Sequence, residues 1–439
     1  MVVCRRDFGR VLGRAARRKA KGRRRSNRLS AERLEARRLL AADATVGIQG
    51  GNQSLIGQNV DFVVTFDNDV NDPPDPLAEV GYSPFVNIIM PATGDFPASP
   101  MKNGISVQPN TKAFYNNTAL VTKIIEFDAS GQATHPFAKD ASGQPVIVHG
   151  KEGDQLVVVE LPFGSYGPTQ PAVNINFEGV ISADANPAHA YDLEVQGGYR
   201  YQLDTAGNPT VDHAEFGPSK TDPIQPQLFR LKKTSSGHEA ETATGPNFQH
   251  AYTVSMAVAN GQTVDDLILK DILPDEVQFV SVQSISGHGS TTQTQLSTPS
   301  ISTPGGELSY EFDKIIGTGQ YTDAQLVFDY YVAQKDANGQ DVIPLELGGT
   351  KIITNSSSAI GEWTSTNPDI GSQTISSSPT DQNSKHELTA RTVALQKHFT
   401  NHSSPGAPVK AGDIVEYRLE FQVSDFFALN DFTLTDVMS

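Results

Sequence analysis

Cysteine is almost absent from this sequence, because its 439 residues include only Cys4. The chain beyond Cys4 therefore has no disulfide and no cysteine-based metal or redox centre. The basic N-terminal residues also lack the apolar core that an ordinary secretory signal needs, and no transmembrane segment is expected. No enzyme motif is present. The sequence therefore predicts a non-enzymatic protein, whose function has to be inferred from its architecture.

Turn-forming residues and an uneven charge are what the sequence does have. The 37 Gly and 27 Pro indicate many turns and few long helices. Residues 5–38 contain 15 Arg or Lys and three acids, although the whole chain has a net charge of −16. Such asymmetry separates a tail or address from a folded body. The acidic body argues against nucleic acid as a partner.

Residues 1–44 are predicted to be a basic leader, disordered or with a short helix. An arginine-rich arm that binds nucleic acid is the alternative. The leader ends in Leu-Glu-Ala-Arg-Arg-Leu-Leu-Ala-Ala-Asp, residues 34–43. This stretch resembles the LEPR-XLL segment near the N-terminus of large exported proteins of planctomycete-type bacteria, with Ala36 where that motif has proline. The resemblance implies export to an extracellular or cell-surface location.

Beyond the leader, alternating apolar residues and frequent turn signals predict an all-β fold. At Asp128–Gln132, as at Asp140–Gln144, Asp begins a turn and Gly occupies the position that needs a positive φ. Short strands with turns every 8 to 12 residues or so are typical of a β-sandwich. The predicted domains are a divergent sandwich at 45–222, a second sandwich at 223–384 and the incomplete start of a further repeat at 385–439.

A lysine-bearing strand occurs twice. Residues 229–233, Phe-Arg-Leu-Lys-Lys, are echoed by residues 393–397, Val-Ala-Leu-Gln-Lys. An aspartate follows each at nearly the same distance: Asp271 comes 38 residues after the first lysine strand, and Asp436 comes 39 residues after the second. Lys397 and Asp436 are therefore the candidate counterparts of Lys233 and Asp271 in a second copy of this pattern. We expect the chain to be a fragment of a longer series of repeats.

Residues 226–365 resemble the isopeptide-forming, conserved-repeat domains of bacterial pilins and surface adhesins. The resemblance is carried by Lys233 in a first strand, by the run 269–274 that contains Asp271, and by Asn355 in a late strand. In that family a lysine and an asparagine are joined through an intramolecular amide, with the help of a buried acid. The resemblance implies tandem Ig-like β-sandwiches. Applied to this sequence, the resemblance makes Lys233 the nucleophile, Asn355 the electrophile and Asp271 the proton shuttle.

The alternation of side chains along a strand supports burial of these three residues. Lys233, Asp271 and Asn355 each fall on the same face as an apolar neighbour two positions away. Burial disfavours the charged form of an amine, and a neutral amine can attack an amide. The alternative is a partly exposed ion pair between Lys233 and Asp271, with Asn355 bonded to the backbone.

Calcium is the one cofactor that the sequence leaves open. Asp67, Asp69 and Asp72 lie close together, and clustered oxygen atoms suit this cation. An EF-hand is excluded, because Asp72 occupies the position of the required Gly and Ala78 that of the required Glu. A looser calcium site and a polar turn remain as alternatives.

The sequence thus favours a non-enzymatic extracellular or cell-surface protein with a structural or adhesive role, whose partner is an unidentified surface or matrix component. The alternative is a carbohydrate- or calcium-binding module of a larger secreted enzyme. Tyr199, Tyr201 and Phe216 would supply its aromatic surface, although such residues more often pack within a sheet. Trp363 is predicted to be a core residue, at the start of a loop and linker spanning 361–384.

Overall fold

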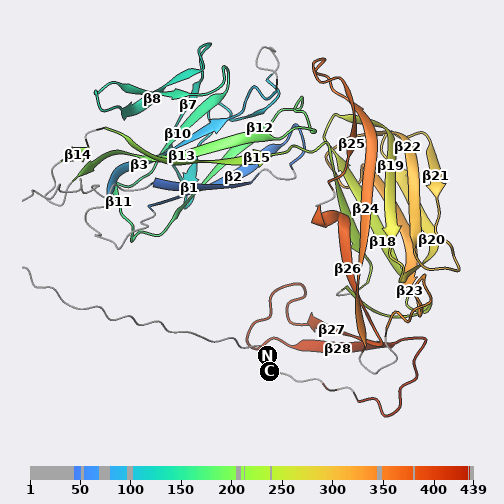
Figure 1. Cartoon of the computed structure of the whole chain (residues 1–439). Coiled ribbons are helices and arrows are strands. Elements are labelled where there is room, and N and C mark those ends of the chain that lie inside the picture. The colour runs from blue at the N-terminus through green and yellow to red at the C-terminus, as the bar shows by residue number, and fades with distance from the viewer. Residues whose placement is uncertain are drawn as a thin grey trace, which may run out of the picture. The chain divides into compact units, whose positions relative to one another are not determined.

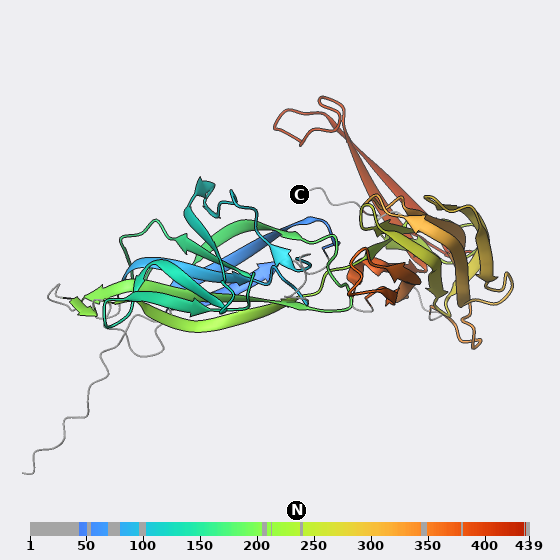
Figure 2. The ribbon, with the colours of Figure 1, turned by 90° about the horizontal axis from the view of Figure 1, so that it is seen from above.

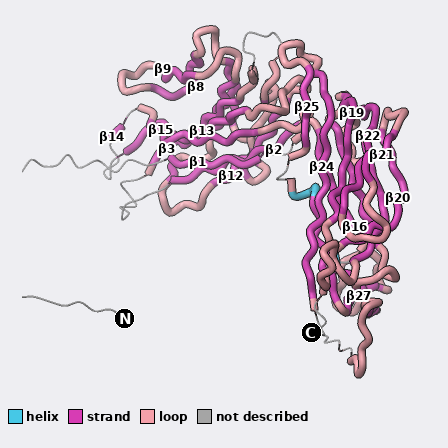
Figure 3. Tube along the Cα trace, turned by 45° about the vertical axis from the view of Figure 1, so that its right-hand side comes forward, coloured by secondary structure: helices cyan, strands magenta, loops and turns pink. Residues whose placement is uncertain are grey.

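The computed structural model describes residues 44–50, 54–68, 80–95, 102–203, 209–211, 213–237, 240–343, 349–378, 381–433 and 435. Residues 1–43 of the predicted leader, with its LEPR-XLL-like segment, lie outside these residues, as do Asp69, Asp72 and Asp436, whereas Ala44 already begins the first strand. Strands dominate the described chain, as the tube of Figure 3 shows, together with the short 3₁₀ helix η2 (Gln382–Ser384). The predicted all-β fold class is confirmed. No helix in the described part is long and apolar enough to cross a membrane.

The N-terminal sandwich consists of two main sheets and a small hairpin, coloured blue to green in Figure 1. The first sheet contains β1 (Ala44–Gly50), β2 (Asn59–Asn68), β12 (Val173–Ile181), β5 (Phe114–Tyr115) and β6 (Thr118–Ala119) in that order, with β4 (Ile105–Ser106) beside β12. The second contains β14 (Pro209–Val211), β13 (Tyr191–Leu203), β3 (Gly81–Met90), β10 (Gln155–Glu160) and β7 (Val121–Glu126), with β11 (Ser165–Tyr166) beside β3 and β15 (Glu215–Ile224) beside β13. The hairpin is formed by β8 (Gln132–Lys139) and β9 (Pro145–His149).

The turns of this sandwich follow from their sequences. In the turn after β7, Oδ1 of Asp128 accepts hydrogen bonds from the amides of Ser130, at 2.8 Å, and Gln132, at 2.9 Å. Gly131 has a φ of 68°, which residues with a side chain rarely adopt. Asp140 repeats the same bonds in the turn between β8 and β9. Both turns lie where the sequence predicts them.

The second sandwich consists of a four-stranded sheet facing a larger one. The smaller sheet contains β16 (Phe229–Ser235), β18 (His250–Val258), β23 (Ala324–Val332) and β20 (Val277–Gly287) in that order. The larger contains β17 (Glu241–Ala243), β26 (Lys385–Arg391), β24 (Thr350–Thr364), β19 (Thr263–Leu273), β22 (Gly306–Ile316) and β21 (Gln293–Ser297), with β25 (Ser372–Ser376) beside β24. These strands can be followed in yellow and orange in Figure 2.

Side-chain alternation places the core of the second sandwich between its two sheets. Every second residue of β23 is buried, from Ala324 to Val332, and β23 lies between β18 and β20. In β18 the inward residues Tyr252, Val254 and Met256 are fully buried. Burial of such side chains supplies most of the favourable free energy of a sandwich.

The predicted loop and linker at 361–384 is wrong in part. Strand β24 continues to Thr364, and β25 pairs with it along its last five residues. Trp363 is buried, as predicted, and its Nε1 donates to Oε1 of Gln262 at 2.9 Å. The sheet also extends beyond residue 384, because β26 pairs with β24 as far as Arg391. The polar residues of this stretch form strands because they pair with β24, which belongs to the sheet. The local composition does not reveal this pairing.

The chain continues into the hairpin of β27 (Val393–Asn401) and β28 (Val415–Val423). Its strands are antiparallel and form a separate two-stranded sheet. The alternate residues Ala394 and Gln396 are buried, whereas Leu395 and Phe399 on the other face are exposed. One face of the hairpin is therefore covered, and the other is open.

Candidate functional site

The two sheets of the second sandwich bring Lys233, Asp271 and Asn355 into its core. Lys233 lies on β16 of the smaller sheet, which packs against β24 of the larger one. Asp271 on β19 lies opposite Ser357 on the neighbouring strand β24. Asn355 is two residues from Ser357 and shares its face, so it is a diagonal cross-strand neighbour of Asp271.

Lys233 and Asp271 are in direct contact inside the core. Nζ of Lys233 donates to Oδ2 of Asp271, and both side chains are 0% exposed. Burial lowers the pKa of Lys233 well below its ordinary value, because the apolar surroundings disfavour the ammonium. The partly exposed ion pair is therefore wrong. Transfer of one proton along this contact leaves a neutral amine beside a carboxylic acid, with no net charge buried.

Asn355 is fully buried, and its carboxamide makes no hydrogen bond with the residues that the structure describes. Among the described residues neither Oδ1 nor Nδ2 of Asn355 has a partner, and Oδ1 of Asp271 also has none. Leaving a buried polar atom unpaired costs about 1–3 kcal/mol. The alternative, a hydrogen bond between Asn355 and the backbone, is therefore not found among the described residues. Three unsatisfied atoms in one core cluster need an explanation beyond packing.

Aromatic rings enclose the lysine amine. Nζ of Lys233 lies 4.4 Å from the centroid of the Tyr252 ring and 5.6 Å from that of Phe328. Tyr252 stacks on Tyr330 with a centroid separation of 3.9 Å, and the Tyr330 hydroxyl is 2.7 Å from Oγ of Ser235. Burial raises the pKa of Tyr330 to about 12. These rings exclude water from the amine, and the alternation of side chains along β18 and β23 is what places them on the core face.

His386 is the residue of this site that sequence reasoning missed. It lies directly opposite Asn355 in the β24–β26 ladder, and its ring meets Tyr252 edge to face at 5.6 Å. Burial lowers the pKa of His386, and the nearby Lys233 lowers it further. Because β26 was assigned to a later repeat, nothing local indicated that His386 faces this core.

The second-copy lysine occupies a corresponding strand. Lys397 lies on β27, with its Nζ 4.6 Å from the centroid of the Tyr417 ring on β28. Asp436 is not among the described residues. The structure therefore places one member of the second-copy pair.

The calcium and carbohydrate alternatives gain no support from the described residues. Asp67 is the penultimate residue of β2, and no cluster of three or more His, Cys, Asp or Glu that could hold a metal is found in the described part of the chain. Tyr199 is fully buried against Phe66, and Phe216 packs edge to face on Phe85. Tyr201 is partly exposed but stacks on Tyr82 rather than offering an open ring.

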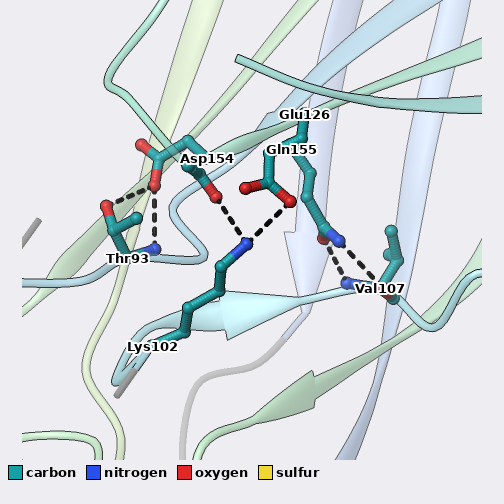
Figure 4. Close-up of polar contacts among 7 residues, drawn as sticks. Thr93, Lys102, Val107, Glu126, Asp154 and Gln155 are labelled. Atoms are coloured by element: carbon teal, nitrogen blue, oxygen red, sulfur yellow. Dashed lines mark hydrogen bonds and ion pairs between the residues drawn. The ribbon is translucent and has the colours of Figure 1, made fainter. Parts of the chain in front are cut away.

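A network of polar contacts in the N-terminal sandwich holds a loop in place (Figure 4). Oδ1 of Asp154 accepts from the amide of Thr93 at 2.9 Å and from its hydroxyl at 2.6 Å. Nζ of Lys102 reaches Oε2 of Glu126 at 2.8 Å. The carboxamide of Gln155, the first residue of β10, hydrogen-bonds to both the amide and the carbonyl of Val107. Side chains at the start of β10 therefore hold the segment that contains β4.

Comparison with known proteins finds no matching family model and no matching curated protein. Solved structures with similarity include BcpA, the major pilin subunit of Bacillus cereus, at 9% identity and a TM-score of 0.20, covering 72% of this chain and 85% of that one. The collagen adhesin of S. aureus is 6% identical with a TM-score of 0.17, covering 88% and 97%. AvmM, which catalyses macrocyclization in alchivemycin A biosynthesis, is 11% identical with a TM-score of 0.22, covering 43% and 90%. The assignment of the fold rests on the strand pairing of this chain itself.

Proposed function

We propose that this chain is an extracellular or cell-surface structural protein, with a stalk or adhesive role, whose second sandwich is cross-linked by an amide between Lys233 and Asn355. The observation that carries the proposal is the buried contact of Lys233 with Asp271, beside a carboxamide that has no hydrogen bond among the described residues. The cysteine-free body is consistent with it, since a secreted protein without disulfides needs either another covalent constraint or a large core. The basic leader, with its LEPR-XLL-like segment, supports the location.

The reaction is an amide exchange that needs no oxidant and no cofactor. A proton passes from Lys233 to Asp271 along their contact, which leaves a neutral amine. Nζ of Lys233 attacks Cγ of Asn355, while the protonated Asp271 donates to the carboxamide oxygen. The bond from Cγ to Nδ2 then breaks, and Nδ2 leaves as ammonia after taking up the proton that the attacking amine loses. The products are a secondary amide and one ammonia molecule.

Three features are costly before the reaction, namely the buried ammonium, the unpaired carboxamide oxygen and the unpaired carboxyl oxygen, and the new bond removes them. The amine becomes an amide nitrogen, so no ammonium has to be buried. The new amide oxygen accepts from the protonated Asp271, so the acid also gains a partner. The cross-link closes a loop of about 120 residues, for which chain-entropy reasoning gives a stabilisation of about 4 to 5 kcal/mol.

The intact mass of the purified full chain tests the cross-link. We expect a mass one ammonia lower than the sequence requires, and a branched peptide joining Lys233 to Asn355 after proteolysis. Asp271→Ala should restore the full mass, because the proton shuttle is lost. Lys232→Ala is the matched control, since Lys232 is exposed on the opposite face of β16. A wild-type chain of full mass contradicts the cross-link.

A separate experiment tests the location, so that the two parts of the proposal can fail independently. In intact cells that produce the protein, a membrane-impermeant biotin reagent should label its lysines. Labelling that appears only after lysis contradicts a surface location and leaves the mass result untouched.

A further inference from the structure

The carboxamide of Asn355 lies between two groups that can exchange protons. Strand β24, which carries Asn355, pairs with β19 on one side and with β26 on the other. Asp271 on β19 is the diagonal neighbour of Asn355, whereas His386 on β26 is directly opposite it. Directly opposite side chains of an antiparallel ladder share one face, with their Cβ atoms about 4.5–5.5 Å apart. An acid and an imidazole therefore flank the same carboxamide from the two neighbouring strands.

The imidazole of His386 has a buried nitrogen that no other contact uses. Among the described residues, Nδ1 of His386 is buried without a hydrogen-bond partner, like both amide atoms of Asn355 and Oδ1 of Asp271. An imidazole nitrogen that carries no hydrogen is an acceptor, and an acceptor left unpaired in a core costs free energy. A fourth unsatisfied atom in this cluster indicates that His386 has a role in the same chemistry.

The surroundings of His386 keep its ring neutral and in place. The ring meets Tyr252 edge to face, with the centroids 5.6 Å apart, and Nζ of Lys233 lies over that same Tyr252 ring. Burial lowers the pKa of His386 and the charge of Lys233 lowers it further, although the neighbouring Glu387 acts in the opposite direction. A neutral imidazole can accept a proton, whereas an imidazolium cannot. The ring is therefore in the form that a proton acceptor needs.

We infer that His386 is the proton carrier of the cross-linking reaction: its Nδ1 takes the proton that Nζ of Lys233 loses and gives it to Nδ2 of Asn355. This inference rests on the proposed cross-link, and it assigns the one proton transfer that Asp271 does not make. Asp271 serves the carboxamide oxygen, whereas direct transfer between the two nitrogens would pass through a strained four-membered ring.

One acceptor is sufficient for both nitrogens. After the attack, Nζ of Lys233 and Nδ2 of Asn355 are bonded to the same carbon, Cγ of Asn355, so a base beside that carbon can serve each in turn. The bond from Cγ to Nδ2 breaks as Nδ2 takes up the proton, and ammonia leaves. His386 returns to its neutral form, so the products remain one secondary amide and one ammonia molecule.

The rate at which the full chain loses ammonia tests this role. Chain made in a brief pulse of cell-free synthesis is sampled over time, and the fraction with the ammonia-deficient mass gives the rate. A positioned acid or base contributes about 10²–10⁴-fold, so His386→Phe, which keeps a ring against Tyr252, should cross-link about 100-fold or more slowly. His250→Phe is the matched control and should keep the wild-type rate, because the half-buried His250 meets Tyr330 instead, at 6.0 Å.

Chemical rescue separates a proton carrier from a packing residue. In His386→Ala, added imidazole should raise the rate in proportion to its concentration, whereas pyrrole, a ring of the same size without a basic nitrogen, should not. Unchanged fluorescence of the buried Trp363 shows that the second sandwich of each variant is folded. If the wild type cross-links and His386→Phe is equally fast, or if both rings rescue alike, the role of His386 is overturned. A wild-type chain that keeps its full mass is a different result, because it overturns the cross-link together with this role.

Discussion

The amine of Lys233 lies 4.4 Å from the centre of the Tyr252 ring, on the strand next to its own. An aromatic face attracts a cation by about 2 kcal/mol or more when the pair is desolvated. The ring therefore lowers the cost of burying Lys233 before any reaction, and it holds the amine on the side of β16 that faces Asp271.

Substitution of Tyr252 separates the ring from its hydroxyl. The hydroxyl approaches Asn355 but has no hydrogen-bond partner among the described residues. Tyr252→Phe should therefore leave the ammonia-deficient mass unchanged and the stability within about 1 kcal/mol of the wild type. Tyr252→Leu should slow cross-linking during refolding, as followed by mass against time. Equal loss of the cross-link in both variants would show that the hydroxyl, rather than the ring, is required.

Removal of the electrophile should cost most of the stability that the cross-link gives. In Asn355→Ala the loop stays open, so the second sandwich should lose about 4 kcal/mol of unfolding free energy. Trp363, the single tryptophan of the chain, is buried in this sandwich and reports its unfolding by fluorescence in guanidinium. Lys232→Met, on the exposed face, should retain the wild-type midpoint. An Asn355→Ala midpoint equal to that of the wild type would contradict the stabilising role.

His135 should remain neutral well into the acidic range. Burial, followed by the charge of Arg200, lowers its pKa to about 4. Its Nδ1 accepts from the amide of Ala138 at 2.9 Å, so a proton there would disrupt this bond, while Nε2 lies 3.1 Å from Oδ1 of Asn87. Titration by NMR should show the His135 signals shifting near pH 4 rather than near 6.5, the ordinary pKa of a histidine.

This lowered pKa has a defined effect on stability. The unfolded chain binds the proton at the ordinary pKa of 6.5, whereas the folded chain binds it only near 4. The contribution of His135 is thus complete above pH 6.5 and is lost as the pH falls toward 4. His135→Gln should flatten the pH dependence of N-terminal sandwich unfolding in this window. A His135 that titrates near the ordinary pKa of 6.5 would contradict the prediction.

Loss of the Asp154 carboxylate should loosen the loop that Figure 4 shows. Asp154→Ala leaves the amide and hydroxyl of Thr93 without their acceptor, at a cost of about 1–3 kcal/mol. Hydrogen exchange of peptides covering residues 91–107 should become faster, while β13 remains protected. Glu152→Ala, at an exposed neighbouring position, should leave exchange unchanged. Equal exchange in Asp154→Ala and the wild type would show that backbone bonds alone hold the loop.

Side-chain alternation was sufficient to predict which residues face inward. The period of two places Lys233 with Leu231, Asp271 with Leu269 and Asn355 with Ile353, and each of these apolar partners is buried. The turn at Asp128 was likewise predictable, because its hydrogen bonds are made within five residues. Local geometry thus determined the turns and the inward direction of the candidate residues.

Only the tertiary structure decided which of these inward residues meet. The pairing of β19 with β24 makes Asn355 a neighbour of Asp271, and the pairing of β24 with β26 brings in His386. Both depend on hydrogen bonds between strands that are distant in the sequence, and a β-ladder leaves no local mark of its partner. For the same reason the local sequence predicts a linker where the structure has β25. The sequence by itself determined the faces of the strands, and the packing of one sheet on the other determined the site.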